Sequence, residues 1–243
     1  MKNTIEIIYQ DDNMLVVNKP AGMLVIPDQH TDETQTLVGI LKQQLGQKIW
    51  VVHRIDRDTT GVLVFAKNAE AHRNLSMQFE HSQVSKKYIA LLSGVLEDDE
   101  GTINKRILVS DRQVTIDITG KESITDYKVL ERFKGYTLVE ANPKTGRRHQ
   151  IRVHFWSIGH PLAIDAEYGT ADPLLLSSLK RKYKEKTGHQ EKPLMDRLTL
   201  HAAELTINYE SRLTSDESKT MTFTAPLPKD FEITLKQLRK YWK

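Results

Sequence analysis

Residues 53–61, HRIDRDTTG, lie between two apolar runs, IWVV at 49–52 and VLVFA at 62–66. Short apolar runs rich in β-branched and aromatic side chains predict buried strands, and the charged residues between them predict a loop at a sheet edge. Loops that a rigid sheet holds in place often carry reactive side chains. Asp56 is therefore the first candidate for a catalytic residue.

Composition sets limits on the kind of protein. The chain has 243 residues and is 39% hydrophobic, which is enough to fill a core without covalent cross-links. It contains no cysteine, so disulfides, thiolate metal sites, iron–sulfur clusters and a cysteine nucleophile are excluded. No run approaches the roughly 18 apolar residues of a membrane span, and the first residues lack a signal-peptide core. We expect a soluble, cytoplasmic monomer.

The charge is informative mainly through its distribution. A formal net charge of +3 is too small to establish a nucleic-acid partner. Basic residues gather in four places, at 86–87, 144–152, 180–186 and 239–243. Each group could contact phosphates, and each could equally be a solvated surface.

The apolar pattern predicts more strands than helices. The expected strands are 5–9, 14–18, 49–52, 62–66, 86–94, several short segments within 101–141, 201–208 and 219–226. Helices are expected at 36–45 before Gly46, after Asn68, from Thr145 onward, and at the C-terminus. Strands and helices do not alternate regularly, which favours an α+β fold with a mixed, mostly antiparallel sheet and flanking helices. We expect a single domain over 1–243, with 170–193 as a basic insertion that contains a short helix.

Residues near Asp56 in the sequence, or expected near it in the sheet, could share its chemistry. Arg54 lies two positions away, Tyr88 belongs to a predicted strand, and Arg152 belongs to the helix predicted from Thr145. An aspartate that only caps a turn is the alternative.

The segment 144–154 is dense in hydrogen-bond donors, namely Arg147, Arg148, His149, Gln150, Arg152 and His154. Guanidinium groups beside the start of a helix suit an anion such as phosphate. Ile151, Phe155 and Ile158 form an apolar stripe, while Arg148 and Arg152 lie one turn apart on another face. Because the helix has a buried face, its polar residues cannot all turn away from the sheet. A charged surface helix is the alternative.

Two other functions deserve comparison. Histidines 149 and 154 are five positions apart with no glutamate between them, which does not suit a zinc pair, and His53, His160 and His201 are expected to be structural. Asp56, Asp58 and Thr60 match the D-x-D-x-T loop of magnesium-dependent phosphatases. That loop requires an uninterrupted strand before the first aspartate and a later acidic pair, whereas the acidic run at 97–100 is expected in a surface turn.

Several longer motifs, in order, match one known family. They are NKPAGMLV at 18–25, HRIDRDTTGVLVFAKN at 53–68, KKYIALLSG at 86–94, PKTGRRHQIRVHFWSIGHPLAIDAEYG at 143–169, and LHAAEL with FTAPLP at 200–205 and 223–228. With these motifs the chain resembles the RluA-type family of RNA pseudouridine synthases. The resemblance implies a mixed, mostly antiparallel sheet around an RNA-binding cleft, and a catalytic domain without the N-terminal S4 domain of many relatives.

The resemblance also implies roles for single residues. Asp56 would be the catalytic carboxylate, Tyr88 would pack against the target uracil, and Arg152 would pair with Asp56. Arg54 would meet the RNA and Ile151 would line the pocket. The other candidates for substrate binding are His53, Thr60, Arg147, Arg148, His149 and Gln150. The chain departs from the family pattern at Ile55, Thr60 and Ile164, where the family more often has Leu, Ser and Gly.

The implied reaction isomerises specific uridines of structured ribosomal or transfer RNA, presented in a stem-loop, and needs no cofactor or metal. Asp56 could attack the sugar, attack the base, or remove a proton, and the sequence leaves these routes open. A phosphatase using Asp56 and Asp58, or an inactive RNA-binding module, are the alternative functions.

Overall fold

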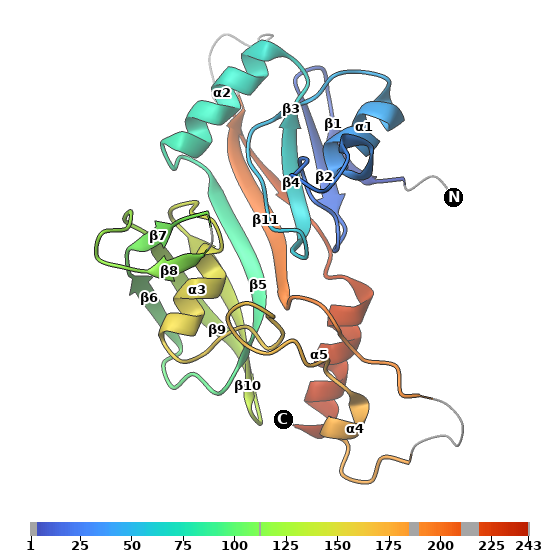
Figure 1. Cartoon of the computed structure of the whole chain (residues 1–243), viewed down its shortest axis with the longest axis vertical. Helices are drawn as coiled ribbons and strands as arrows, with labels where there is room; N and C mark the ends of the chain where they lie inside the picture. The colour runs from blue at the N-terminus through green and yellow to red at the C-terminus, as the bar shows by residue number, and fades with distance from the viewer. Residues whose placement is uncertain (1–3, 112, 185–189, 210–218, 243) are drawn as a thin grey trace. The chain divides into compact units, whose positions relative to one another are not determined.

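The computed structural model describes residues 4–111, 113–184, 190–209 and 219–242 (Figure 1). Its strands are β1 Glu6–Gln10, β2 Met14–Lys19, β3 Trp50–Val51, β4 Thr60–Ala66, β5 Ser85–Ser93, β6 Glu100–Asn104, β7 Ile107–Val109, β8 Val114–Ile116, β9 Ile124–Phe133, β10 Tyr136–Pro143, β11 Leu200–Tyr209 and β12 Lys219–Thr224. Its helices are α1 Leu37–Leu45, α2 Ala69–Glu80, α3 Gln150–Ser157, α4 Leu176–Leu179 and α5 Lys229–Tyr241, with a 3₁₀ turn at Glu33–Gln35.

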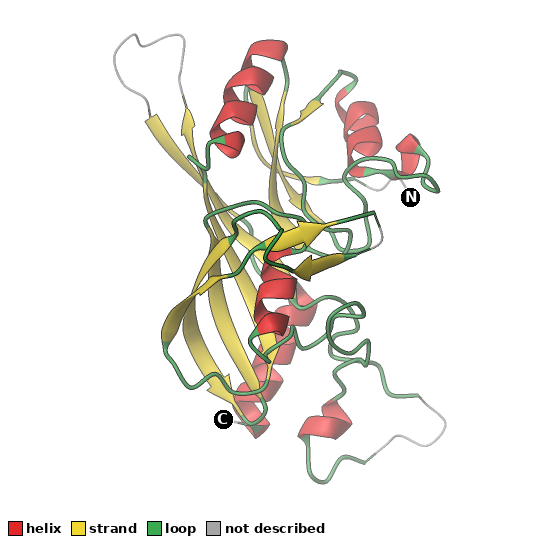
Figure 2. Cartoon of the chain, turned by 60° about the vertical axis from the view of Figure 1, so that its left-hand side comes forward, coloured by secondary structure: helices red, strands yellow, loops and turns green. Residues whose placement is uncertain are grey.

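Most strands join one sheet. The hydrogen-bonded order is β1-β2-β4-β11-β5-β10-β9-β6, with β3 on β4 and β12 on β11, while β7 and β8 form a separate hairpin. The β4–β11 pair is parallel, and the pairs β1–β2, β2–β4, β9–β10, β6–β9 and β11–β12 are antiparallel. Figure 2 shows strands as the main regular element. The predicted α+β class with a mixed, mostly antiparallel sheet is confirmed.

The chain divides into two compact units. Unit 1 comprises Met1–Tyr88 and His201–Pro226, and unit 2 comprises Ile89–Leu200 and Leu227–Lys243. Strands β5 and β11 contribute residues to both. That the whole chain acts as a single catalytic domain remains a prediction.

Unit 1 is built around β2 and β4, which are buried on both faces. Alternate side chains of each strand point to opposite faces. Leu15 and Leu63 pack with α1, whereas Val16 and Val64 pack with Leu75 of α2 (Figure 1). The loop that contains Asp56 leads directly into β4, so a strand held from both sides anchors one end of this loop.

Unit 2 has its main core where α5 meets the sheet. Phe231, Leu235 and Leu238 of α5 pack with Leu91 of β5 and Phe133 of β9. The hairpin β7–β8 lies beside α3 in Figure 1, and Val153 of α3 packs with Ile107 and Val114. Helix α3 is therefore covered on the side that faces the hairpin.

The caps expected at Gly46 and Asn68 are confirmed. Thr36 caps α1 through its side chain, and Gly46 ends the helix in the left-handed region with φ 66°. The Asn68 side chain accepts a hydrogen bond from the Ala71 amide at the start of α2. The short helix expected within 170–193 is α4, although 185–189, including Lys186, lie outside the described residues.

The predicted start of the third helix is wrong. Helix α3 begins at Gln150 instead of Thr145, because the Gln150 side chain accepts hydrogen bonds from the Thr145 hydroxyl and the Arg147 amide and closes a turn there. His149 precedes the helix in the left-handed region, with φ 54°. Arg148 is therefore not one helical turn from Arg152: the former is exposed before the helix, and the latter is buried within it.

Within the part of the chain that is described, every helix is too short or too polar to cross a lipid bilayer.

Candidate active site

A buried lysine holds the Asp56 loop. The Lys19 side chain has no exposed surface, and its ammonium donates hydrogen bonds to the backbone carbonyls of Pro20, Arg57 and Thr59 at 2.9, 2.7 and 2.9 Å. Lysine is seldom fully buried unless its charge is satisfied in this way. Lys19 therefore joins the KPAG segment to both sides of the turn that follows Asp56.

Further bonds fix the same turn. The Met23 amide donates to the Arg57 carbonyl at 3.2 Å, and the Thr59 amide donates to the Asp56 carbonyl at 3.2 Å. Thr59 is 1% exposed, and its hydroxyl has no hydrogen-bond partner among the described residues. A buried hydroxyl of this kind is uncommon in a purely structural turn. The loop thus presents the half-buried side chain of Asp56 on a rigid support.

Tyr88 of β5 lies close to Asp56 within unit 1. Its ring packs against the core cluster that contains Ile55 and Leu63. Burial, followed by the negative charge of Asp56, raises the pKa of the Tyr88 phenol well above its usual range. The phenol therefore stays protonated at neutral pH and offers a flat ring and a hydroxyl donor beside the carboxylate.

His53 and Thr60 support the loop from within the protein. The ring of His53 stacks on Phe79 with centroids 4.1 Å apart, and its Nε2 accepts a hydrogen bond from the Val64 amide at 3.1 Å. Burial and the nearby Lys86 ammonium lower the pKa of His53 to about 3. The buried Thr60 hydroxyl bonds His201 Nδ1 at 2.8 Å. These contacts favour a structural role over the RNA contact that the resemblance implied.

His160 and His201, which were also expected to be structural, are satisfied by the protein. His201 Nε2 bonds the Ala225 carbonyl at 3.1 Å, and His160 Nδ1 bonds the Ser93 carbonyl at 3.2 Å. No three histidine or acidic side chains of the described residues are grouped to hold a metal ion.

Helix α3 buries its polar residues as well as its apolar ones. Gln150, Arg152 and His154 are each less than 9% exposed, as is Ile151. The Gln150 amide group donates to the Ile124 carbonyl and the Thr125 hydroxyl at 2.9 and 3.0 Å. Gln150 therefore anchors the start of the helix. Arg152 is charged as well as buried, so its charge must be neutralised by a nearby group.

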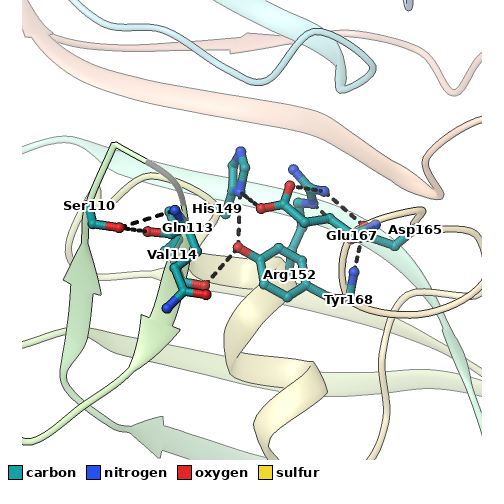
Figure 3. A network of polar contacts seen from close by, with 8 residues as sticks. All are labelled: Ser110, Gln113, Val114, His149, Arg152, Asp165, Glu167 and Tyr168. Atoms are coloured by element: carbon teal, nitrogen blue, oxygen red, sulfur yellow. Dashed lines mark hydrogen bonds and ion pairs between the residues drawn. The ribbon is translucent and has the colours of Figure 1, made fainter.

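Two carboxylates hold Arg152 in unit 2 (Figure 3). Its Nε and Nη2 donate to the two oxygens of Asp165 at 2.7 and 2.8 Å, and Nη2 also donates to Glu167 at 3.1 Å. Burial alone would raise the pKa of Asp165, but the hydrogen bonds and charge of Arg152 lower it below its usual value. The pairing of Arg152 with Asp56 stays a prediction.

Glu167 and Tyr168 extend this network to the start of α3. His149 Nδ1 lies 3.2 Å from Glu167 Oε1 and 3.1 Å from the Tyr168 hydroxyl. That hydroxyl donates to the Val114 carbonyl at 3.0 Å (Figure 3). These contacts of the His149 side chain stabilise the left-handed backbone conformation of the same residue.

The other expected RNA contacts are more accessible. Arg54 and Arg148 are exposed, and Arg147 is half-buried with its Nε donating to the Glu122 carbonyl at 3.3 Å. Lys19 and Asp165 hold the Asp56 loop and Arg152, and neither was predicted from the sequence to do so. Both stand in quoted motifs, NKPAG and AIDAEYG, and an acidic or basic residue inside an apolar motif is the signal that could have identified them.

Comparison with known proteins agrees with this geometry. Residues 13–157 match the family model described as RNA pseudouridylate synthase. The chain belongs to this family.

Similar RNA pseudouridine synthases cover most of the chain. The ribosomal large subunit pseudouridine synthase C of Vibrio parahaemolyticus is 37% identical over 96% of this chain and 69% of its own length. The tRNA pseudouridine synthase C of Pasteurella multocida is 40% identical over 68% of this chain and 75% of its own length. The solved structure of human RNA Pseudouridylate Synthase Domain Containing 1 has a TM-score of 0.72 and 26% identity, covering all of this chain and 89% of that one.

The chain is thus an RNA pseudouridine synthase of the RluA type, an isomerase. The family model spans the Asp56 loop, Tyr88 and the whole of α3. The phosphatase and the inactive RNA-binding module are not favoured.

Proposed function

We propose that Asp56 is the carboxylate that isomerises a uridine in ribosomal or transfer RNA. The observation that carries this proposal is the proximity of Asp56 and Tyr88, which is close enough for the carboxylate charge to raise the phenol's pKa. A charged group beside an aromatic face, on a loop fixed by a buried lysine, is a preorganised arrangement for handling a base.

The reaction breaks the bond between N1 of uracil and C1′ of ribose, turns the base, and joins C5 to C1′. Atoms and electrons balance without an external reactant, because the proton lost from C5 replaces the bond lost at N1. Asp56 serves as the nucleophile, or as the base that removes a proton from the sugar. Tyr88 stacks on the freed uracil and limits the directions in which it can turn.

Arg152 supplies positive charge to this carboxylate. A cation near Asp56 keeps it ionised in a site that must exclude water to retain the freed base. This step rests on the family resemblance and on the way Asp165 and Glu167 hold the guanidinium.

The target uridine lies in a loop or a bulge of a structured RNA. A base must leave its stack to reach the carboxylate, which costs a few kcal/mol and least where it is unpaired. Arg54 and Arg148 are exposed, and in this proposal they contact the surrounding phosphates. Relatives named for ribosomal and for transfer RNA support both classes as substrates. We place the reaction in the cytoplasm and the enzyme as a monomer.

Mapping pseudouridine in cellular RNA tests this function. Deletion of the gene should remove pseudouridine from a small set of uridines in ribosomal or transfer RNA, and the wild-type gene should restore it. An unchanged map in the deletion strain, with the protein shown to be expressed in the parent strain, would contradict the proposed substrate class.

A further inference from the structure

Two hydrogen bonds from one carboxylate, that of Asp165, fix the orientation of the Arg152 guanidinium. Asp165 accepts from Nε and Nη2 through its two separate oxygens, at 2.7 and 2.8 Å. A paired contact of this kind aligns the two planar groups and fixes the rotation of the guanidinium in its own plane. The Tyr168 ring lies beneath the guanidinium, 5.1 Å from its central carbon. The edge of the guanidinium therefore contacts Asp165, and its face contacts the Tyr168 ring.

Asp165 is itself immobilised. Its Oδ1 accepts from the amides of Glu167 and Tyr168 at 3.0 and 3.2 Å, and its carbonyl accepts from the Gly169 amide at 2.9 Å. Its amide donates to the Thr170 carbonyl at 2.8 Å. The loop 165–170 thus forms a closed turn around one carboxylate, so the position of Asp165 does not depend on the pairing with Arg152.

Stability alone is a poor explanation for this pair. The Asp165 side chain has no exposed surface and that of Arg152 is 10% exposed. Bringing two charges out of water costs about as much as their attraction returns, and apolar replacements are often as stable. A second carboxylate, Glu167, adds negative charge next to the same guanidinium. A buried ion pair that adds little stability but fixes the orientation of Arg152 is expected where that orientation matters for function.

A second fork in unit 2 provides the contrast. Arg197 donates through Nε and Nη2 to the two oxygens of Asp230 at 2.6 and 2.8 Å. The side chain of Asp230 is 35% exposed, and the pair joins the segment before β11 to the start of α5. This fork has the same geometry as the first but lies among structural residues, so it serves as an internal control.

We infer that Asp165, assisted by Glu167, is a positioning residue that sets the orientation of Arg152 for the isomerisation. The inference rests on the proposed function, because Arg152 has a task there only if Asp56 is the reacting carboxylate. Loss of Asp165 should then slow the chemical step while RNA binding and the fold are retained.

Single-turnover pseudouridine formation at saturating enzyme separates these effects. Asp165→Asn keeps the size of the side chain but replaces one acceptor with a donor that faces the guanidinium. We expect the rate to fall by about 10- to 100-fold, the usual result of a misplaced reacting group, with the RNA dissociation constant within about twofold of wild type. Asp230→Asn removes an equivalent fork and should leave the rate within about twofold.

The controls keep the inference open to failure. Thermal unfolding of both variants shows whether each is folded. If Asp165→Asn does not fold, Glu167→Gln replaces it as the test variant, because the Glu167 side chain is 40% exposed. We expect Glu167→Gln to lower the rate by a smaller factor than Asp165→Asn. The inference is overturned if folded Asp165→Asn has a wild-type rate, or if its loss of rate equals that of Asp230→Asn. If Asp165→Asn is unfolded, a wild-type rate for Glu167→Gln overturns it. An inactive Asp56→Asn in the same assay shows that the proposed function stands in that case, whereas an active one would reject the proposed function itself.

Discussion

Tyr88 shows how a neighbouring charge defines the role of a side chain. Burial and the Asp56 charge raise the pKa of its phenol, so the neutral form persists when free tyrosines near pH 10 lose their proton. A phenol with this property cannot act as a base at neutral pH. Its contribution must come from its ring, or from its hydroxyl as a donor.

We predict that Tyr88→Phe is milder than Tyr88→Ala in single-turnover pseudouridine formation, because phenylalanine keeps the stacking face. A spectrophotometric titration between about pH 9.5 and 10.5, half a unit on either side of the pKa of a free phenol, should not distinguish Tyr88→Phe from wild type, since Tyr88 does not ionise there. Equal, severe losses in both variants would assign the main role to the hydroxyl. A missing titration step in Tyr88→Phe would show that the phenol ionises normally.

Single residues were predictable where their chemistry is direct. Asp56 and Tyr88 were predicted as candidates because a carboxylate in a charged loop and an aromatic in a strand motif suggest reacting groups, and the structure brings the two close together. Lys19 and Asp165 were missed because their importance lies in what they hold, and a lysine that ends a strand is normally exposed. Thr60 and Gln150 stood within the right motifs, but only three-dimensional contacts reveal that they support the protein itself. For His53, a structural role was already expected from the sequence, and its contacts favour that role.

At the level of elements, Gly61 lies at the start of β4, directly after the Asp56 loop. It has φ 113°, and a side chain added there would meet the carbonyl oxygen of Ala202 at 2.1 Å. Ala202 is the partner of Gly61 in the parallel β4–β11 pair. The glycine is thus required by both the backbone conformation and the closeness of the neighbouring strand.

We predict that Gly61→Ala lowers the free energy of unfolding by about 3 kcal/mol or more, from backbone strain together with a steric clash. Gly46→Ala is the matched control, since Gly46 also has a positive φ but open space around it. It should cost about 1 kcal/mol. Urea titrations measure both, and similar small losses for the two variants would show that β11 does not restrict Gly61.

The elements themselves followed from local signals, with one exception. Alternating apolar residues predicted the strands, and Asn68 and Gly46 predicted helix ends because capping is a local interaction. The start of α3 depends on the Gln150 side chain reaching back to Thr145 and Arg147. No periodic pattern contains that contact, so the helix was placed too early.

For the whole molecule, surface charge acts on an RNA at longer range than any other property of the protein. The segment 180–184 carries four cations, Lys180, Arg181, Lys182 and Lys184. Arg181, Lys182 and Lys184 are exposed. A cluster of this kind after α4 suits a phosphate backbone, and a solvated surface remains the alternative.

We predict that changing Arg181, Lys182 and Lys184 to Gln weakens RNA binding without slowing single turnover at saturating enzyme. Each lost phosphate contact should reduce the slope of log affinity against log salt by roughly 0.7, hence by up to about two units in all. The same change at Lys229, Lys236 and Lys240 of α5, which are also exposed, removes the same net charge and is the control. An unchanged salt slope would assign the segment to ordinary surface.

The most direct test of the account is the activity of Asp56→Asn on an RNA that the wild-type enzyme modifies. Pseudouridine formed in a single turnover is measured by nucleoside analysis, with Asp58→Asn as the control because Asp58 is an exposed carboxylate in the same loop. We predict no product above background for Asp56→Asn, unchanged RNA binding, and a rate near wild type for Asp58→Asn. Retention of about a tenth or more of the wild-type rate by folded Asp56→Asn would contradict the account.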